Sequence, residues 1–106
     1  MSGPPTGSSP LHASGAIDAG GNTGTALRGL SLPLFHLTGL YVLLLEQPID
    51  ETECMVLVTF RGLAALDHSA VVEQYDDAEK RVHVRNSLGN PANAAFDVQI
   101  IRLRTG

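Results

Sequence analysis

Three consecutive residues carry the side-chain types of a hydrolase triad. They are Asp67, His68 and Ser69. A triad depends on geometry, because each group must lie within hydrogen-bond reach of the next, and three consecutive side chains do not normally align in this way. The chain also lacks the Gly-x-Ser-x-Gly turn that presents a nucleophilic serine. We therefore interpret this stretch as a polar loop whose Asp67 or Ser69 bonds the local backbone, and we predict no catalytic residues and no enzyme.

The histidines and the acidic segments are the candidate metal ligands. No two of the histidines are spaced to share one metal ion within a chain, although His36 or His83 could converge with its copies on the axis of a symmetric oligomer. The segments 50–53 and 76–80 are rich in carboxylates, which calcium prefers, but neither has the glycine and terminal glutamate of an EF-hand loop. We read 76–80 as a hairpin turn that keeps its Asp and Lys side chains in water. The full set of histidines is His12, His36, His68 and His83.

The single cysteine, Cys54, excludes a disulfide within the chain and argues against a structural zinc site. It begins an apolar run beside Met55, so we predict a small buried side chain. A reactive thiol is the alternative, but no neighbouring residue supplies an activating base. The glycine-rich segment 15–24 has no phosphate-binding lysine. We predict no cofactor and no metal.

Size and charge narrow the function classes further. The chain has 106 residues, enough for one domain, and a formal net charge of −4 with seven scattered basic residues. These features argue against nucleic-acid binding, which needs clustered positive charge. The apolar run 40–45 is too short to span a bilayer, and no signal peptide is visible, so we expect synthesis in the cytoplasm and no membrane partner.

The chain divides into two regions of different character. Residues 1–27 are rich in Gly, Ser, Thr, Ala and Pro and cannot bury enough apolar surface to offset their ordering entropy, so we predict an extended N-terminal arm that lies on a partner. Within it, only the stretch 14–21 could form a short strand. Residues 28–106 consist of short apolar runs bounded by turn residues, which indicate an all-β body. We predict a small antiparallel β-sandwich, jelly-roll-like, with strands at 30–37, 39–46, 54–61, 70–76, 80–86 and 94–104. The stretch 61–70 is either a helical turn or a loop that crosses between the sheets.

Two runs are too apolar for strands with one face in water. Residues 40–46 and 55–60 have apolar side chains at both parities, a pattern typical of strands buried on both faces. We expect the second apolar face to meet another subunit; the alternative is that the arm or the 61–69 loop covers it. The predicted oligomer interface comprises Tyr41, Leu43, Leu45, Val56, Val58 and Phe60.

The last strand changes parity between Ile100 and Ile101. Either a β-bulge near Ile100-Ile101 places both apolar sets on one face, or the strand end is apolar on both sides because it enters an interface. Parity alone does not separate the two.

Sugar-binding pockets commonly use exposed aromatic rings, and this chain has no Trp. Its aromatic residues mostly fall inside strand patterns. Only Tyr75, at a strand end, is a candidate for an exposed ring.

Three segments together resemble the small β-domains of tailed-bacteriophage virion proteins, such as capsid decoration, head-fibre and tail-fibre-tip proteins. The segments are Gly39 with Tyr41, "VLVTFRG" at 56–62 and "VRNSLGNPANAAF" at 84–96, and "SGAIDAGGN" resembles a lead-in strand. Phe60 stands where a proline often precedes the Arg-Gly pair. The resemblance covers roughly residues 14–104.

This resemblance implies a virion structural protein on the capsid surface. On it we expect a capsid decoration (cement) protein that forms a homo-oligomer, commonly a trimer, and binds the major capsid protein. The alternative is a fibre module that binds host glycans through Tyr75 and the loops 76–80 and 86–93. The residues expected to contact the capsid lie in the arm and are Pro4, Pro5, Pro10, Leu11 and Ile17.

Overall fold

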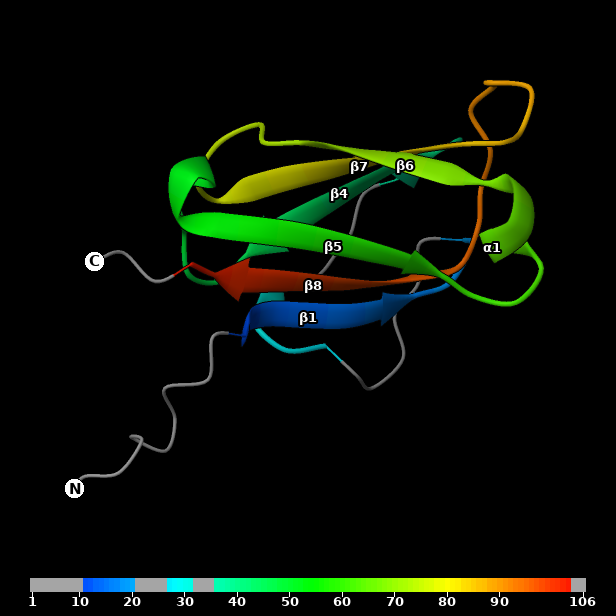
Figure 1. Ribbon diagram of the computed structural model, residues 1–106. Coiled ribbons are helices and arrows are strands. Elements are labelled where there is room, and N and C mark those ends of the chain that lie inside the picture. The colour runs from blue at the N-terminus through cyan, green and yellow to red at the C-terminus, as the bar shows by residue number, and fades with distance from the viewer. Residues whose placement is uncertain (1–10, 21–26, 32–35, 104–106) are drawn as a thin grey trace.

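The computed structural model describes residues 11–20, 27–31 and 36–103. They form two antiparallel β-sheets that pack face to face (Figure 1). The predicted all-β sandwich is therefore confirmed. Strand alternation explains the packing, because every second side chain of a strand points into the space between the sheets.

The first sheet has the strand order β1-β8-β5, and the second has the order β2-β4-β7-β6 with β3 paired to β4. In Figure 1, the first and last strands of the described chain lie next to each other, blue β1 beside red β8. The strands are β1 (Leu11–Ile17), β2 (Leu30–Ser31), β3 (His36–Leu37), β4 (Leu40–Leu45), β5 (Cys54–Phe60), β6 (Ser69–Glu73), β7 (Glu79–Arg85) and β8 (Phe96–Arg102). A short 3₁₀ turn, η1 (Glu51–Glu53), precedes β5, and one short helix, α1 (Ala64–Asp67), follows it.

The helix α1 resolves the alternatives for residues 61–70. The stretch forms a single helical turn, and it also carries the chain from β5 in one sheet to β6 in the other. It buries none of its own residues. Both readings of the sequence therefore describe part of the structure.

The predicted arm, residues 1–27, needs correction at its C-terminal part. Leu11–Ile17 is a full strand that pairs with β8, and the side chain of Ile17 is buried in the core. Leu11 and Ile17 therefore belong to the sandwich, and Ile17 is not accessible to a capsid protein. The remaining predicted arm contacts, Pro4, Pro5 and Pro10, lie outside the described residues.

β1 looks like a linker in the sequence because it is built from small residues. Close packing requires them: a Cβ added to Gly15 would lie 2.7 Å from the Cδ2 atom of Leu27 and 3.1 Å from the Cδ1 atom of Leu30. Ser14 also exchanges two backbone hydrogen bonds of 2.8 Å with Arg28. The strand is held by its pairing partners, by this close contact and by the buried side chains of Ala13 and Ile17.

The parity change in β8 does not arise from a β-bulge in that strand. The β5–β8 register runs without a shift past Ile100 and Ile101, so Ile100 points into the core and Ile101 points to the outer face. The irregularity lies in the neighbouring strand, between Leu11 and Ala13 of β1. The end of β8 is therefore apolar on both sides.

The motifs that carry the family resemblance meet in space. Gly39 donates its N–H to Oδ1 of Asn93 at 2.8 Å, and its carbonyl accepts from the N–H of Val84 at 2.7 Å. Asn93 thus contacts a residue 54 positions away in the sequence. Asn86 bonds locally, since its Oδ1 accepts from the N–H groups of Leu88 and Asn90. The loop between β7 and β8 is thus folded by its asparagines and anchored on Gly39.

Gly39 is required for two reasons that can be separated by mutation. Its φ is +73°, and an added Cβ would lie 2.7 Å from the carbonyl oxygen of Val84. Gly89 has a similar φ of +83°, but nothing lies within 4 Å of its added Cβ. We predict that Gly89→Ala lowers the free energy of unfolding by about 1–2 kcal/mol, the cost of a left-handed alanine. Gly39→Ala adds a backbone clash and should lower it by on the order of 3 kcal/mol or more.

Urea unfolding of the two variants measures this difference. Equal losses of stability would contradict the close packing of the 84–93 segment on Gly39.

Candidate functional site

The six residues of the predicted oligomer interface all point into the sandwich. Tyr41 and Leu43 are fully buried, and Leu45 is 6% exposed. The three from β5 are partly buried and pack against the same core. The prediction that the side chains of these residues form a subunit interface is therefore wrong, because it chose the inward parity of each strand. The β5 residues in question are Val56, Val58 and Phe60.

Tyr41 has a structural task at the centre of the molecule. Its hydroxyl accepts a hydrogen bond from the N–H of Ala94 at 3.2 Å and donates to the carbonyl of Ala19 at 2.9 Å. Its ring packs edge-on against Phe96 with 4.9 Å between the ring centroids. Ala19 follows β1 and Ala94 precedes β8, so one side chain of β4 ties the two sheets together. Burial raises the pKa of the Tyr41 hydroxyl above its usual value of 10.0.

Lys80 is the one buried charged side chain among the described residues. It was expected to lie in water, but it is 0% exposed because it shares the inward parity of Val82 and Val84. Its Nζ donates to the carbonyl of Ile49 at 3.0 Å and to that of Asp76 at 2.9 Å. The ammonium group therefore joins the loop before β5 to the turn before β7.

The carboxylate of Asp50, the first residue of the acidic segment 50–53, caps the short turn that follows it. Asp50 accepts from the backbone N–H of Thr52 at 3.2 Å and from the Thr52 hydroxyl. These bonds lower the pKa of Asp50, and the charge of Lys80 acts in the same direction. Asp50 thus begins the η1 turn.

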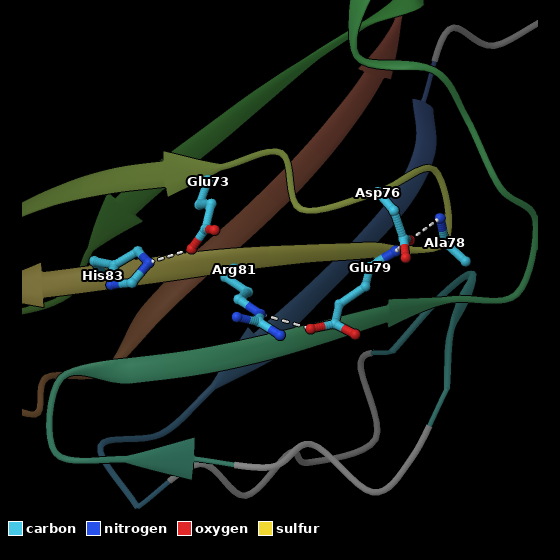
Figure 2. Close-up of polar contacts among 6 residues, drawn as sticks. All are labelled: Glu73, Asp76, Ala78, Glu79, Arg81 and His83. Atoms are coloured by element: carbon cyan, nitrogen blue, oxygen red, sulfur yellow. Dashed lines mark hydrogen bonds and ion pairs between the residues drawn. The ribbon is translucent and has the colours of Figure 1, made fainter.

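The outer face of the β2-β4-β7-β6 sheet carries a charged network (Figure 2). Glu73 of β6 pairs with Nε2 of His83 at 2.8 Å, and Glu79 pairs with Nε of Arg81 at 2.6 Å along β7. The guanidinium group of Arg81 stacks on the ring of Tyr75, 3.6 Å from its centroid. The carboxylate of Glu79 raises the pKa of Arg81. One face of the Tyr75 ring is therefore already occupied, which weakens Tyr75 as a sugar platform.

The turn at 76–80 is organised by its first aspartate. Oδ1 of Asp76 accepts from the backbone N–H groups of Ala78 and Glu79, both at 2.8 Å (Figure 2 shows the bond to Ala78). These bonds satisfy the carboxylate within the turn. In the part of the chain that the structure describes, no group of three or more His, Cys, Asp or Glu residues could hold a metal ion.

The residues of the apparent triad form one pair. Nδ1 of His68 lies 2.7 Å from Oδ1 of Asp67, and the His68 ring lies 6.0 Å from that of Phe60. Among the described residues, no hydrogen bond joins His68 to Ser69. Cys54 is buried, as predicted, and its Sγ lies 3.9 Å from Nε2 of Gln74.

The outer face of the β1-β8-β5 sheet combines a polar depression with an apolar strip. The depression has a volume of about 250 Å³ and contains an ion pair between Arg61 and Asp97, whose Nε to Oδ1 distance is 3.0 Å. Its other polar side chains are Ser14 and Gln99. Asp97 raises the pKa of the Arg61 guanidinium.

The apolar strip lies beside the depression on the same face, since Gln99 of the depression is opposite Leu57 of the strip in the β5–β8 register. Met55 is 47% exposed and Leu57 39% exposed, and both point outward because their neighbours Cys54, Val56 and Val58 point inward. The strip comprises Met55, Leu57, Ile101 and Leu103. The apolar run 55–60 has apolar residues at alternate positions on both faces, and those on the outward face indicated this strip. If the sequence analysis had assigned the outward positions to the interface, it would have named Met55 and Leu57.

No helix in the described segments is both long and apolar enough to cross a membrane.

The raised pKa of Tyr41 predicts a loss of stability in alkali. Because the folded state favours the neutral hydroxyl, the stabilisation is complete below pH 10 and is lost as the pH rises through the raised pKa. In a Tyr75→Phe background, Tyr41 is the only tyrosine, so absorbance titration of the phenolate should give an apparent pKa above 10. A titration at or below 10 would contradict the burial of the hydroxyl. Tyr41→Phe should abolish this alkaline step and lower the free energy of unfolding by about 1–3 kcal/mol, because the N–H of Ala94 loses its acceptor.

Lys80→Met should destabilise the protein by about 1–3 kcal/mol, because two carbonyls lose their donor while the methionine fills a similar volume. Arg85→Met, at the exposed end of the same strand, removes the same charge without burial and is the control. Urea unfolding compares the two. A larger effect of Arg85→Met would show that net charge, not the buried contact, sets the stability.

Comparison with known proteins found no matching family model, no similar curated protein and no similar solved structure. The functional proposal therefore rests on the residues of this chain.

Proposed function

We propose that this protein is a virion structural protein, a capsid decoration (cement) protein that binds the major capsid protein on the head of a tailed bacteriophage. The resemblance in Gly39, Tyr41 and the 84–96 segment supports this proposal. In the described structure these residues build the body of the sandwich: Gly39 contacts Asn93, and Tyr41 contacts Ala94. Residues that shape a small rigid body are consistent with a structural protein that binds and holds capsid subunits.

The observation that carries the proposal is the outer face of the β1-β8-β5 sheet. Its strip of Met55, Leu57, Ile101 and Leu103 leaves apolar surface in water on a small domain. Contiguous exposed apolar surface is typical of sites where proteins bind each other. The adjacent pair of Arg61 and Asp97 adds a polar margin, as interfaces commonly have around an apolar centre.

Binding through this face would stabilise the shell by linkage. A ligand that binds only the assembled form shifts the equilibrium toward that form. If each decoration protein is itself an oligomer, several such faces act together, and the avidity exceeds that of one contact. The resemblance implies three copies, but the proposed function does not depend on that number.

The direct test is to purify virus particles from cells that express the chain and to identify it by mass spectrometry and immunogold labelling. Labelling on the outside of the heads is expected. A chain that stays in the cell lysate and is missing from intact particles would contradict the proposal.

The alternative function is a fibre module that binds host glycans. The depression beside Arg61 favours it, because Ser14, Asp97 and Gln99 offer the hydrogen-bonding groups that sugar hydroxyls use. Glycan-array binding that disappears in Asp97→Asn and persists in Tyr75→Ala would support this alternative over the decoration protein.

A charge on the apolar strip tests the proposed capsid contact. We predict that Ile101→Glu weakens binding to particles by at least about tenfold, because it places a carboxylate in an apolar contact. Ile101 lies on β8, the central strand of its sheet, so the change does not touch a sheet edge. Val71→Glu is the control, since Val71 is 63% exposed on the other sheet. Cosedimentation with particles measures both, after circular dichroism has verified that both variants fold. Equal binding of Ile101→Glu and wild type would move the contact away from this face.

A further inference from the structure

The end strand β5 has one edge that lacks the usual protection against pairing with another strand. Among the described residues, β5 is an end strand of its sheet and pairs with β8 alone. It is seven residues long, "CMVLVTF", with no charge and no proline, and its register with β8 has no bulge. Natural sheets usually protect their end strands with a charged residue, a proline or a β-bulge, because the unpaired backbone groups of an open edge can bind a strand of another chain.

The backbone groups that face this open edge can be assigned. The N–H of Arg61 donates to the carbonyl of Ala95, and the N–H of Leu103 donates to the carbonyl of Glu53. Since hydrogen-bonded pairs alternate along an antiparallel ladder, Met55, Leu57 and Thr59 direct their backbone groups to β8. The residues between them direct theirs to the open edge. Within the described chain, no hydrogen bond outside the sheet engages the backbone of those residues, which are Cys54, Val56, Val58 and Phe60.

We propose that a second copy of this chain pairs with this edge, β5 against β5 in antiparallel orientation around a two-fold axis at Leu57. This alignment places Cys54 opposite Phe60 of the second copy and Val56 opposite Val58 of the second copy. All four residues then use their free N–H and C=O groups. The two three-stranded sheets join into one continuous sheet of six strands.

The sequence of β5 suits self-pairing in particular. Two copies of one strand bring identical residues together near the axis, where a charged residue would face its own copy, and like charges opposite each other destabilise a sheet. β5 has no such residue. At the axis, Leu57 meets Leu57 of the second copy on the outer face, with Met55 opposite Thr59 on either side. In the single chain, Met55 is 47% exposed and Leu57 39% exposed. The pairing would cover the side of each residue that faces the open edge.

The other end strands of the two sheets are less suited. β6 is five residues long and ends in Glu73, β2 has only two residues, and Ser14 of β1 already exchanges two backbone hydrogen bonds with Arg28. The β5 pairing also leaves the outer face of the β1-β8-β5 sheet free and aligns the strips of two copies. It does not depend on the proposed function, and it predicts a dimer in place of the trimer that the resemblance implies.

Light scattering of the purified full-length chain over a concentration series tests the proposal. Wild type should have twice the mass of one chain. Leu57→Lys and Leu57→Glu should each weaken the dimer by on the order of tenfold or more, because like charges meet at the axis. An equimolar mixture of the two variants should restore a dimer, because opposite charges then face each other. Gln99→Lys is the matched control: Gln99 is exposed opposite Leu57 in the β5–β8 register, on the same outer face but one strand from the edge.

A crosslink tests the alignment without relying on charge. In a Cys54→Ala background, Leu57→Cys should oxidise to a covalent dimer, because directly opposed residues of a non-hydrogen-bonded pair lie within disulfide range. Gln99→Cys in the same background should stay uncrosslinked. A wild-type chain that is monomeric or trimeric would overturn the proposal. So would a mixture of charge variants that does not recover a dimer, or a Gln99 variant that dissociates or crosslinks as the Leu57 variant does.

Discussion

The burial of one phenol hydroxyl governs how the two sheets fit together. Tyr41 brings a polar group into an apolar core, where a hydroxyl without partners costs more than a hydrogen bond gains. Its partners are backbone groups of Ala19 and Ala94, which lie at the ends of β1 and β8. The hydroxyl can be satisfied only when both segments have folded onto β4. Gly39, two residues earlier, holds the same loop through Asn93. A short stretch of β4 thus specifies the position of the opposite sheet.

Lys80 is a second buried side chain whose polar end must bind backbone groups of other segments of the chain. Its alkyl chain shares the inward face of β7 with Val82 and Val84, and its ammonium group ends on two backbone carbonyls. In both cases a long side chain crosses the interior and ties down a loop by its polar end. A sandwich with few aromatic residues gains specificity from such contacts, because each one is satisfied in a single arrangement. The pairs Arg61–Asp97 and Glu73–His83, by contrast, lie at exposed positions on the outer faces of the two sheets and contribute little to stability.

With the interior occupied in this way, the surface is where a partner can bind. The inward residues of β4 and β5 are used within one chain, so association falls to their neighbours of opposite parity and to the open edge of β5. The open edge of β5 and the outer face of its sheet can bind different partners at the same time. Pairing at the edge uses backbone N–H and C=O groups, whereas the apolar strip on the outer face binds through side chains. A two-fold pair would align two such strips on one continuous sheet. That arrangement suits a protein that holds a regular surface, as a decoration protein would.

The sequence by itself determined the class of fold and most of the strands. Alternation and breakers placed β4, β5 and β7 within a residue or two, because the two-residue period of a strand is a local property of the chain. Tertiary structure decided the rest. The small residues around Gly15 indicated at most a short strand within 14–21. The full strand β1 forms because β8 pairs with it and because Leu27 and Leu30 pack where a side chain would be. Parity reports that a run has two apolar faces, but which face is the core depends on the sheet opposite. For this reason Tyr41, Leu43 and Leu45 were assigned to a partner, although the opposing sheet of the same chain covers them, and Lys80 was assigned to water, although two distant carbonyls hold it inside.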